Sequence, residues 1–275
     1  MTVQVNPEIA NSIAAGAIRT NYHDQGEGAP VVLIHGSGPG VSAWANWRLN
    51  IGPLARAKRV IAPDMVGFGF TDRPEGVTYG KDLWVKHLAD LLDALGIEQT
   101  DLVGNSFGGG LAIAFAIRYP QRVRRMILMG SVGVSFPLTD GLDAVWGYQP
   151  SIGNMRKLLD IFAYDRTLVN DELAELRYKA SVRPGFQESF SSMFPAPRQA
   201  GIDALASDES EIAKLVQPAL LIHGREDKVI PAEASRRLFE LLPNAELHMF
   251  GKCGHWTQIE HTERFNMLVA DFLRD

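Results

Sequence analysis

The sequence predicts an α/β fold in which helices cover a mostly parallel sheet and a block of helices is inserted near the middle of the chain. Short, uninterrupted apolar runs such as residues 31–34 are typical of strands buried on both faces of a parallel sheet. These runs alternate with helix-like patterns, which indicates a parallel sheet. The alternation stops between about 135 and 210. We therefore expect a core of residues 1–134 and 211–275 and a helical cap of residues 135–210.

The elements before the cap follow from local patterns. Residues 1–30 predict an edge strand or hairpin, because short apolar stretches alternate there and end in the Gly- and Pro-containing turn 24–30. The remaining runs predict strands at 31–34, 59–62, 101–103 and 126–129. Helices are expected at 43–57, 81–95 and 109–119, and the leucines of 81–95 recur at helical spacing.

The segment 135–210 differs from its surroundings in composition. It is rich in aromatic residues, methionine and proline, and its helical patterns at 151–163 and 170–181 are not interrupted by a buried strand. An insertion of this kind is expected to form a lid over a pocket. The core pattern then resumes with a strand at 219–223, a helix at 232–242, a strand at 246–250 and a last helix at 259–273.

Composition and charge narrow the class of protein. Hydrophobic residues make up 46% and charged residues 21% of the 275 residues, as in folded globular proteins. The net charge of -5 and the lack of a Lys/Arg block argue against a nucleic-acid partner. The single cysteine, Cys253, cannot form an intramolecular disulfide, and neither a signal-peptide pattern nor an apolar run of about 18 residues is present. We therefore expect a cytoplasmic protein without a membrane partner.

The segment Gly-Asn-Ser-Phe-Gly at 104–108 has the pattern G-x-S-x-G between an apolar run and a helix-like run. In that setting a serine sits on a strained turn from strand to helix, and its hydroxyl points out of the sheet. The helix behind Ser106 would direct its N-terminus and the Phe107 N–H at a developing oxyanion. The motif also occurs by chance, and Ser106 would then be an ordinary turn serine. Residues elsewhere in the chain are needed to decide whether Ser106 is a nucleophile.

A serine nucleophile needs a general base and a group that orients the base. Asp227 follows the strand 219–223 and His255 follows the strand 246–250, so the order Ser106, Asp227, His255 is that of the α/β-hydrolases. Glu226 and Asp64 compete for the acid role, but Asp64 is expected to brace the loop after its own strand. The seven histidines are scattered, so no metal or other cofactor is expected, and Cys253 is expected to be structural.

Five segments together resemble one known family, the meta-cleavage product hydrolases, which hydrolyse carbon–carbon bonds in bacterial aromatic degradation. The similarity runs nearly end to end and is greatest to the monoalkyl branch, the 2-hydroxymuconate semialdehyde and 2-hydroxy-6-oxohepta-2,4-dienoate hydrolases. The segments are HGSGPG at 35–40, WAN at 44–46, GNSFGG at 104–109, ELAELRY at 172–178 and CGHW at 253–256.

This resemblance implies a role for each matching residue. Ser106, Asp227 and His255 would form a catalytic triad, and the backbone N–H groups of Ser37 and Phe107 would form the oxyanion hole. Many relatives have glycine where this chain has Ser37, but a backbone donor survives that change. The residues implied to bind the dienoate part of the substrate are Gly36, Gly38, Asn46, Asn105, Arg177 and Trp256. Without the resemblance, Arg177 would be interpreted as a solvated arginine on a cap helix.

The substituent at C6 of the substrate would need an apolar pocket. Candidates are Val132, Val134, Phe136, Leu138, Trp146, Ile152, Phe162 and Val229. Of these, Val132 follows the strand 126–129, and a branched residue at a pocket mouth would favour small substituents such as hydrogen or methyl.

The expected reaction is hydrolysis of a 2-hydroxy-6-oxo-2,4-dienoate to 2-hydroxypenta-2,4-dienoate and a carboxylic acid. His255 would assist ketonisation, and Ser106 or a water that it activates would attack C6; an acyl-serine and a gem-diol route both stay open. A carboxylesterase on the same fold and a ligand receptor are the alternatives, whereas Ser106 excludes dehalogenases and epoxide hydrolases that use an aspartate at this position. The resemblance also implies a homo-oligomer, at least a dimer.

Overall fold

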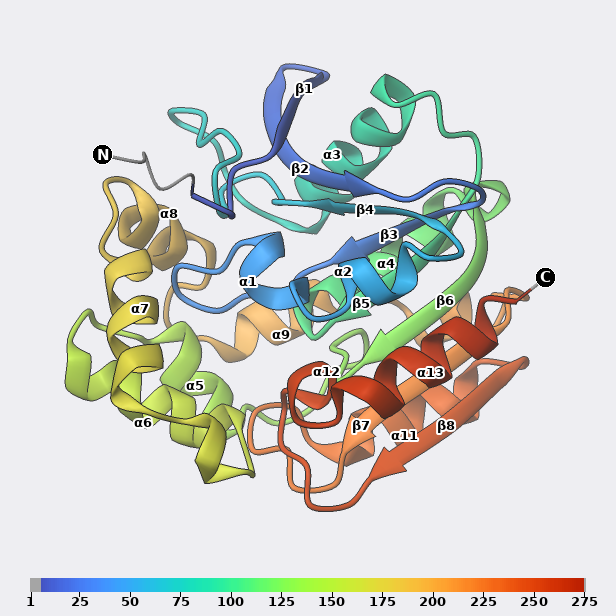
Figure 1. The fold of residues 1–275 in the computed structure, drawn as a ribbon. Coiled ribbons are helices and arrows are strands. Elements are labelled where there is room, and N and C mark those ends of the chain that lie inside the picture. Colours follow the sequence, from blue (N-terminus) through green and yellow to red (C-terminus); the bar gives the residue numbers. More distant parts are fainter. Residues whose placement is uncertain (1–5, 275) are drawn as a thin grey trace.

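An eight-stranded sheet lies at the centre of the molecule (Figure 1). The computed structural model describes residues 6–274, so the first five residues of the predicted N-terminal hairpin segment lie outside the described part. The first two strands pair antiparallel, β2 also pairs antiparallel with β4, and the remaining pairs are parallel. In spatial order the strands are β1 (Asn11–Ala15), β2 (Ile18–Gln25), β4 (Arg59–Pro63), β3 (Pro30–Ile34), β5 (Thr100–Asn105), β6 (Val123–Met129), β7 (Ala219–Gly224) and β8 (Ala245–Phe250).

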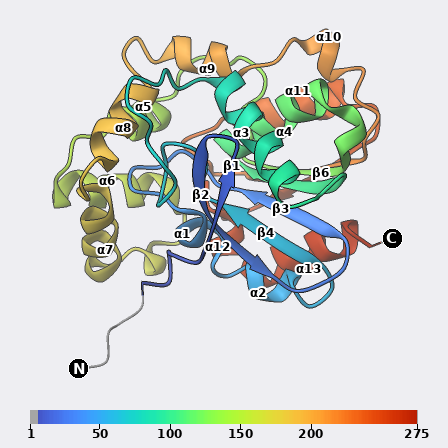
Figure 2. The same ribbon diagram turned by 90° about the horizontal axis from the view of Figure 1, so that it is seen from above.

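Helices cover both faces of the sheet because alternate residues of each buried strand point to opposite sides (Figure 2). In β3, Val31 and Leu33 belong to the core under α1 (Ala43–Trp47), α2 (Ile51–Leu54) and α13 (Thr262–Phe272). Val32 and Ile34 belong to the opposite core, under α3 (Lys81–Ala94), α4 (Phe107–Arg118) and α11 (Ala232–Leu241). The α/β architecture predicted from the sequence is thus confirmed.

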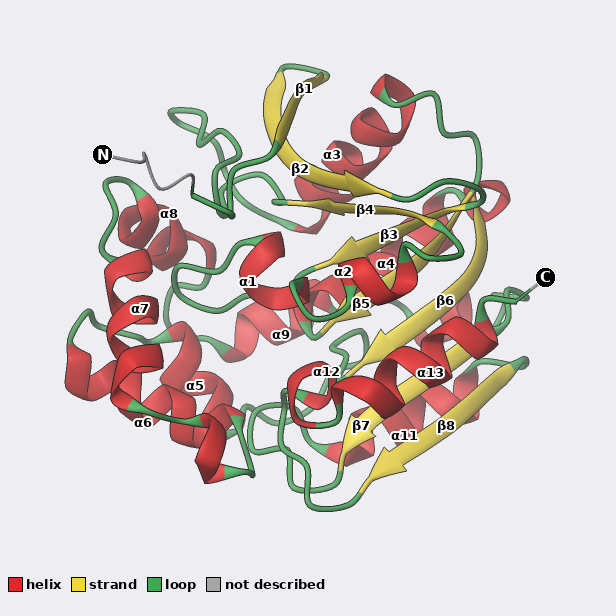
Figure 3. Ribbon diagram, in the orientation of Figure 1, coloured by secondary structure: helices red, strands yellow, loops and turns green. Residues whose placement is uncertain are grey.

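The described segment between β6 and β7 is helical, and residues 135–210 are called the cap below. Figure 3 shows the cap helices beside the end of the sheet toward which the arrowheads of β3, β6, β7 and β8 point. The cap helices are α5 (Asp140–Trp146), α6 (Ile152–Phe162), η2 (Arg166–Leu168), α7 (Asp171–Ser181), α8 (Phe186–Met193) and α9 (Gln199–Leu205), after which α10 (Glu209–Ile212) leads back to β7. The helices α6 and α7 are the two that the sequence predicted.

Two predicted helices are broken in the structure. The helix expected at 43–57 is divided into α1 and α2, because Pro53 has no N–H to donate and instead occupies the first turn of a new helix. The helix expected at 259–273 is divided into α12 (Thr257–Glu260) and α13. The backbone of His261 (φ -126°, ψ 44°) is not helical, and its ring stacks on Phe250 with centroids 4.7 Å apart.

Asp64 braces the loop after β4, as the sequence predicted. Its carboxylate accepts hydrogen bonds from the N–H groups of Ala43 (2.6 Å) and Phe70 (2.7 Å) and from the Asn21 side chain (2.8 Å). Burial raises the pKa of Asp64 to about 6, and these donors oppose that rise. The contact with Ala43 fixes the start of α1, which carries Asn46 to the site described below. Within residues 6–274, no helix combines the length and the apolar composition that crossing a membrane requires.

Candidate active site

Ser106 lies on the sharp turn between β5 and α4. Its φ of +53° is unusual for a residue with a side chain, and such strain is typical of functional turns. Glycines on either side allow the turn to close. A Cβ on Gly104 would lie 2.4 Å from the Gly108 carbonyl oxygen, and a Cβ on Gly108 would lie 2.2 Å from the Ile34 carbonyl oxygen. The elbow geometry expected from G-x-S-x-G is therefore present.

His255 and Asp227 meet at the same end of the sheet, from the loops after β8 and β7. The His255 Nδ1 is 2.7 Å from Asp227 Oδ2, and Asp227 Oδ1 accepts hydrogen bonds from the N–H groups of Val229 (2.7 Å) and Ile230 (3.0 Å). Burial alone would raise the pKa of Asp227, but the charges and hydrogen bonds of His255 and His223 lower it well below its ordinary value. An ionised Asp227 fixes the ring of His255 with Nε2 directed away from the carboxylate.

The competing acid, Glu226, is engaged elsewhere. Its side chain accepts hydrogen bonds from Arg225 (2.8 Å) and from the Cys253 N–H (3.0 Å). Cys253 is fully buried, and burial raises the pKa of its thiol. Within residues 6–274, no three His, Cys, Asp or Glu side chains are grouped so that they could hold a metal ion.

Ser106 and His255 face one cavity of about 250 Å³. No hydrogen bond joins their side chains among the described residues, although both line this cavity and both are 5% exposed or less. Contacts of this kind often tighten only when substrate binds. The backbone N–H groups of Ser37 and Phe107 have no acceptor within the described part of the chain, whereas the Gly36 N–H donates to Asn46 Oδ1 (3.1 Å). Two free donors therefore remain near Ser106.

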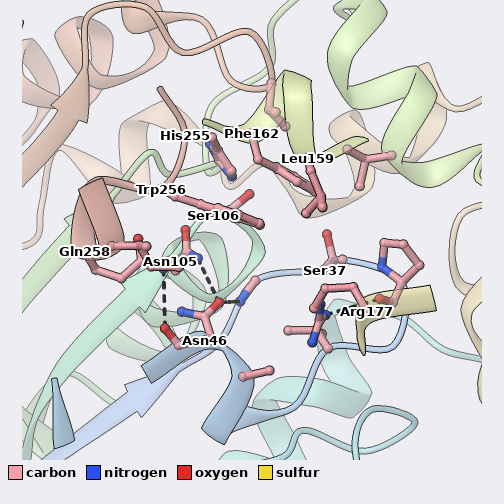
Figure 4. A pocket seen from close by; sticks show the side chains of 18 of the residues that line it. Ser37, Asn46, Asn105, Ser106, Leu159, Phe162, Arg177, His255, Trp256 and Gln258 are labelled. Atoms are coloured by element: carbon pink, nitrogen blue, oxygen red, sulfur yellow. Dashed lines mark hydrogen bonds between the residues drawn. The ribbon is translucent and has the colours of Figure 1, made fainter. Parts of the chain in front are cut away.

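One end of the cavity is polar. Asn105 Nδ2 donates to Asn46 Oδ1 (2.9 Å), and Figure 4 shows this pair beneath Ser106 with Arg177 on the same side. Asn46 Nδ2, Asn105 Oδ1 and Gln258 Oε1 are buried without hydrogen-bond partners among the described residues. Buried polar atoms without partners are costly, so their clustering indicates a place for a polar ligand.

Arg177 supplies the positive charge at this end. Its guanidinium donates to the Pro39 carbonyl oxygen (3.3 Å), and the residues that line the cavity include no Asp or Glu. Burial lowers the pKa of Arg177 to about 10, and the charge of Glu8 opposes that shift. The guanidinium is therefore still charged at neutral pH and is available to a carboxylate ligand.

The other end of the cavity is apolar. In Figure 4, Leu159 and Phe162 of α6 lie on the side of Ser106 away from Asn46 and Arg177. The Phe162 ring also stacks on Trp256, with centroids 4.9 Å apart. The apolar residues that line the cavity also include Leu142, Val145, Met155 and Val229.

Known proteins with this architecture are similar along the whole chain. The family model described as "alpha/beta hydrolase fold" matches residues 29–262. A 2-hydroxy-6-oxo-2,4-heptadienoate hydrolase of Pseudomonas putida is 65% identical over 98% of this chain and 98% of its own length. A 2-hydroxymuconate semialdehyde hydrolase of Pseudomonas sp. strain CF600 is 63% identical over 99% of this chain and 96% of its own. A variant of the meta-cleavage product hydrolase CumD from Pseudomonas fluorescens IP01 is 66% identical, with a TM-score of 0.96 over 97% of this chain and 98% of its own.

The chain belongs to the meta-cleavage product hydrolases. The structure of this hydrolase brings together most of the residues singled out from its sequence. Those that line the one cavity are Gly36, Ser37, Gly38, Asn46, Asn105, Ser106, Phe162, Arg177, Val229, His255 and Trp256. Asp227 lies behind His255, and the Phe107 N–H lies at the start of α4.

Several residues predicted for the apolar pocket of the hydrolase do not line this cavity. The side chain of Val132 points at α4, where a Cβ on Gly110 would lie 2.6 Å from Val132 Cγ2. Trp146 lies behind Ser37 and not on the cavity wall. Its indole N–H donates to Ser37 Oγ (3.0 Å), and its ring stacks on Phe194 with centroids 4.3 Å apart. The other predicted residues that are not on the wall are Val134, Phe136, Leu138 and Ile152.

The sequence did not identify other residues of the cavity wall. Gln258 lies two positions after Trp256, and this spacing is the only signal that could have found it. Leu142, Val145, Met155 and Leu159 come from cap helices, and their sequence pattern does not distinguish a cavity wall from ordinary helix packing. Arg48 and Leu49 line the cavity from the turn that breaks the predicted helix 43–57.

Proposed function

We propose that this hydrolase cleaves the C5–C6 bond of 2-hydroxy-6-oxo-2,4-dienoates, giving 2-hydroxypenta-2,4-dienoate and a carboxylic acid. The observation that carries the proposal is the single cavity that joins Ser106 to Arg177 past the asparagine pair Asn46–Asn105. The names of the relatives at 63–65% identity support the same substrate class.

The chemistry requires more than a triad. Cleavage of an ester expels an alkoxide, whereas cleavage of the C5–C6 bond expels a carbanion that must be delocalised. A proton delivered to C5 of the dienolate gives the keto tautomer, in which the C2 carbonyl accepts the electron pair of the breaking bond. A cation beside the C1 carboxylate and the C2 oxygen stabilises that charge. Arg177 is suited to this role because its planar guanidinium binds a carboxylate through two hydrogen bonds.

The proposed roles at the reacting carbon follow from the geometry. His255, oriented by Asp227, would move the proton during ketonisation and activate Ser106 or a water at C6. The N–H groups of Ser37 and Phe107 would hold the oxygen of C6 as it becomes negative. In the net reaction water supplies OH to C6 and a proton to C5, so no redox partner is needed.

We also propose that the C6 substituent is small and uncharged. It would occupy the end of the cavity formed by Leu159 and Phe162 of α6, whose side chains carry no charge and no hydrogen-bonding group. A carboxylate there would lose its hydration without gaining a partner. Relatives at 37–40% identity are named as hydrolases of nonadienedioates, which carry a second carboxylate, and the side chains of Leu159 and Phe162 offer no hydrogen-bond donor for one.

The test is to follow the dienolate absorbance when purified protein meets 2-hydroxy-6-oxohepta-2,4-dienoate, beside Ser106→Ala and beside a p-nitrophenyl ester. We expect rapid bleaching with pentadienoate and acetate as products, and its loss in Ser106→Ala. No bleaching together with brisk ester turnover would contradict the proposal and favour the esterase alternative.

The proposal also covers the cellular location and the oligomeric state. We place this enzyme in the cytoplasm, supported by its single cysteine and its composition, and as a homo-oligomer that is at least a dimer. Light scattering on the purified protein measures the oligomeric state directly, and a monomeric mass would contradict the second feature.

A further inference from the structure

We propose that Glu260 is a positioning residue for His255, because its carboxylate fastens the His255 loop to the end of cap helix α6. The inference rests on the proposed role of His255 as general base. It adds a means by which the cap and the triad are held in one arrangement.

Glu260 binds backbone groups from two distant segments. Its Oε2 accepts hydrogen bonds from the N–H groups of Tyr164 and Asp165, both at 2.8 Å, just after α6 ends. Its Oε1 accepts a hydrogen bond from the Gly254 N–H at 2.7 Å, directly before His255. A carboxylate that receives three backbone donors is held firmly, since each bond is charge-assisted. The two segments are about 90 residues apart in the chain, so this is more than a local turn cap.

Direct contacts continue the same connection. The His255 N–H donates to the carbonyl oxygen of Phe162, the last residue of α6, at 2.7 Å. The Phe162 ring stacks on His255 with centroids 6.0 Å apart, and it also lines the cavity. Gly254 has no room for a side chain, because a Cβ there would lie 2.5 Å from the Phe162 carbonyl oxygen. A shift of α6 would therefore displace the backbone that carries His255.

The test compares Glu260→Gln with Glu263→Gln. The glutamine at 260 keeps the size of the side chain, but its NH₂ would face a backbone N–H and lose hydrogen bonds on that side. Glu263 is exposed and makes no hydrogen bond or ion pair with any described residue, so Glu263→Gln matches the change of charge. The measured quantities are kcat and KM for the dienoate, the rate at which a small fluorophosphonate labels Ser106, and Tm.

We expect Glu260→Gln to lower both kcat and the labelling rate by roughly 10- to 100-fold, because small misplacements of a catalytic group have effects of this size. The KM should change much less, since the side chain of Glu260 does not line the cavity. Glu263→Gln should leave all of these values unchanged. A lower Tm with unchanged kcat and labelling rate would overturn the proposal, because Glu260 would then only stabilise the fold.

A second pair of variants covers the case in which Glu260→Gln does not fold. Asp165→Pro removes one of the N–H donors to Glu260 without changing Glu260, and the φ of -76° at Asp165 suits proline. Asp165→Ala keeps the N–H and removes the same side chain. We expect slower labelling in Asp165→Pro than in Asp165→Ala, and equal rates would contradict the inference. Labelling needs no dienoate, so failure of the proposed substrate would leave this result interpretable.

Discussion

At the scale of single residues, Arg177 distinguishes this site from that of a simple esterase. An esterase needs the nucleophile, the base and the oxyanion donors, all of which lie at Ser106, His255 and the nearby N–H groups. Arg177 lies beyond them, half-buried on α7 and without a carboxylate on the cavity wall. Its position is explained if the substrate itself carries the carboxylate.

The corresponding prediction is that Arg177→Gln lowers kcat/KM for the dienoate while sparing p-nitrophenyl ester turnover. Hydrogen bonds to charged groups contribute roughly 1.5–3 kcal/mol, which corresponds to about 10- to 150-fold in rate. Steady-state kinetics with both substrates on one preparation checks this. Equal losses on the two substrates would show that Arg177 acts on the fold rather than on the dienoate.

At the scale of elements, the junction of β5 and α4 depends on the absence of side chains. A Cβ on Gly104 would lie 2.4 Å from the backbone of Gly108, and backbone atoms cannot move aside as a side chain can. By contrast, a Cβ on Gly52 in α2 would meet nothing within 4 Å. The two glycines therefore have opposite roles in stability.

We predict that Gly104→Ala lowers the free energy of unfolding by about 1–3 kcal/mol or more, as overpacking does. Gly52→Ala should raise it by about 0.4–1 kcal/mol, because alanine has less backbone freedom to lose on folding. Urea unfolding of both variants beside the wild type measures the two changes. A Gly104→Ala variant as stable as the wild type would contradict this prediction, because the turn would then accommodate a methyl group.

The same elements show which features the sequence can predict. Continuous apolar runs such as Val31–Ile34 predicted the strands, because a strand buried on both faces leaves a strong local signal. Likewise, the order Ser106, Asp227, His255 predicted the meeting of three loops, since parallel strands end at one edge. The break at Arg48–Asn50 was not predicted although Pro53 is a local signal for it, and the hydrogen bond from the Asn50 side chain to Asn266 Oδ1 (2.8 Å) adds a tertiary contact that local patterns do not contain.

The cap was harder to predict because its helices are short and their packing is not periodic. The helices α5, α8 and α9 span seven or eight residues, too few for a clear helical period, and the sequence did not predict them. Outside the cap, the sequence could not distinguish Val132, which packs on α4, from Val229, which lines the cavity. Both are valines after buried strands, and only the fold separates them.

At the scale of the whole molecule, Glu8 links the start of the described chain to both the core and the cap. Its carboxylate accepts hydrogen bonds from Arg183 (3.0 Å), which follows α7, and from Ser42 Oγ (2.7 Å), which precedes α1. Burial would raise the pKa of Glu8, but these hydrogen bonds and the charge of Arg183 outweigh it and lower the pKa below its ordinary 4.5. A lowered pKa of an acid means that its ionised form stabilises the fold above that ordinary value.

We therefore predict that Glu8→Gln lowers the free energy of unfolding at pH 7 by about 1.5–3 kcal/mol, the usual contribution of hydrogen bonds to a charged group. The difference from the wild type should shrink as the pH falls below 4.5 and Glu8 becomes protonated in both states. Urea unfolding at pH 7 and at pH values below 4.5 measures it, with Glu263→Gln as the control for charge. A difference that does not change with pH would rule out an ionic contribution.

The polarity of the cavity also bears on the order in which products depart. Cleavage would leave the dienoate beside Arg177 and the new acid with its carboxyl group at the Ser37 and Phe107 N–H groups and its substituent beside Leu159 and Phe162. Neutral N–H donors hold a carboxylate less strongly than the charged guanidinium of Arg177 does. The new acid should leave first, while the dienoate product dissociates last. Product-inhibition kinetics should accordingly show pentadienoate competing with substrate at concentrations where acetate has no effect.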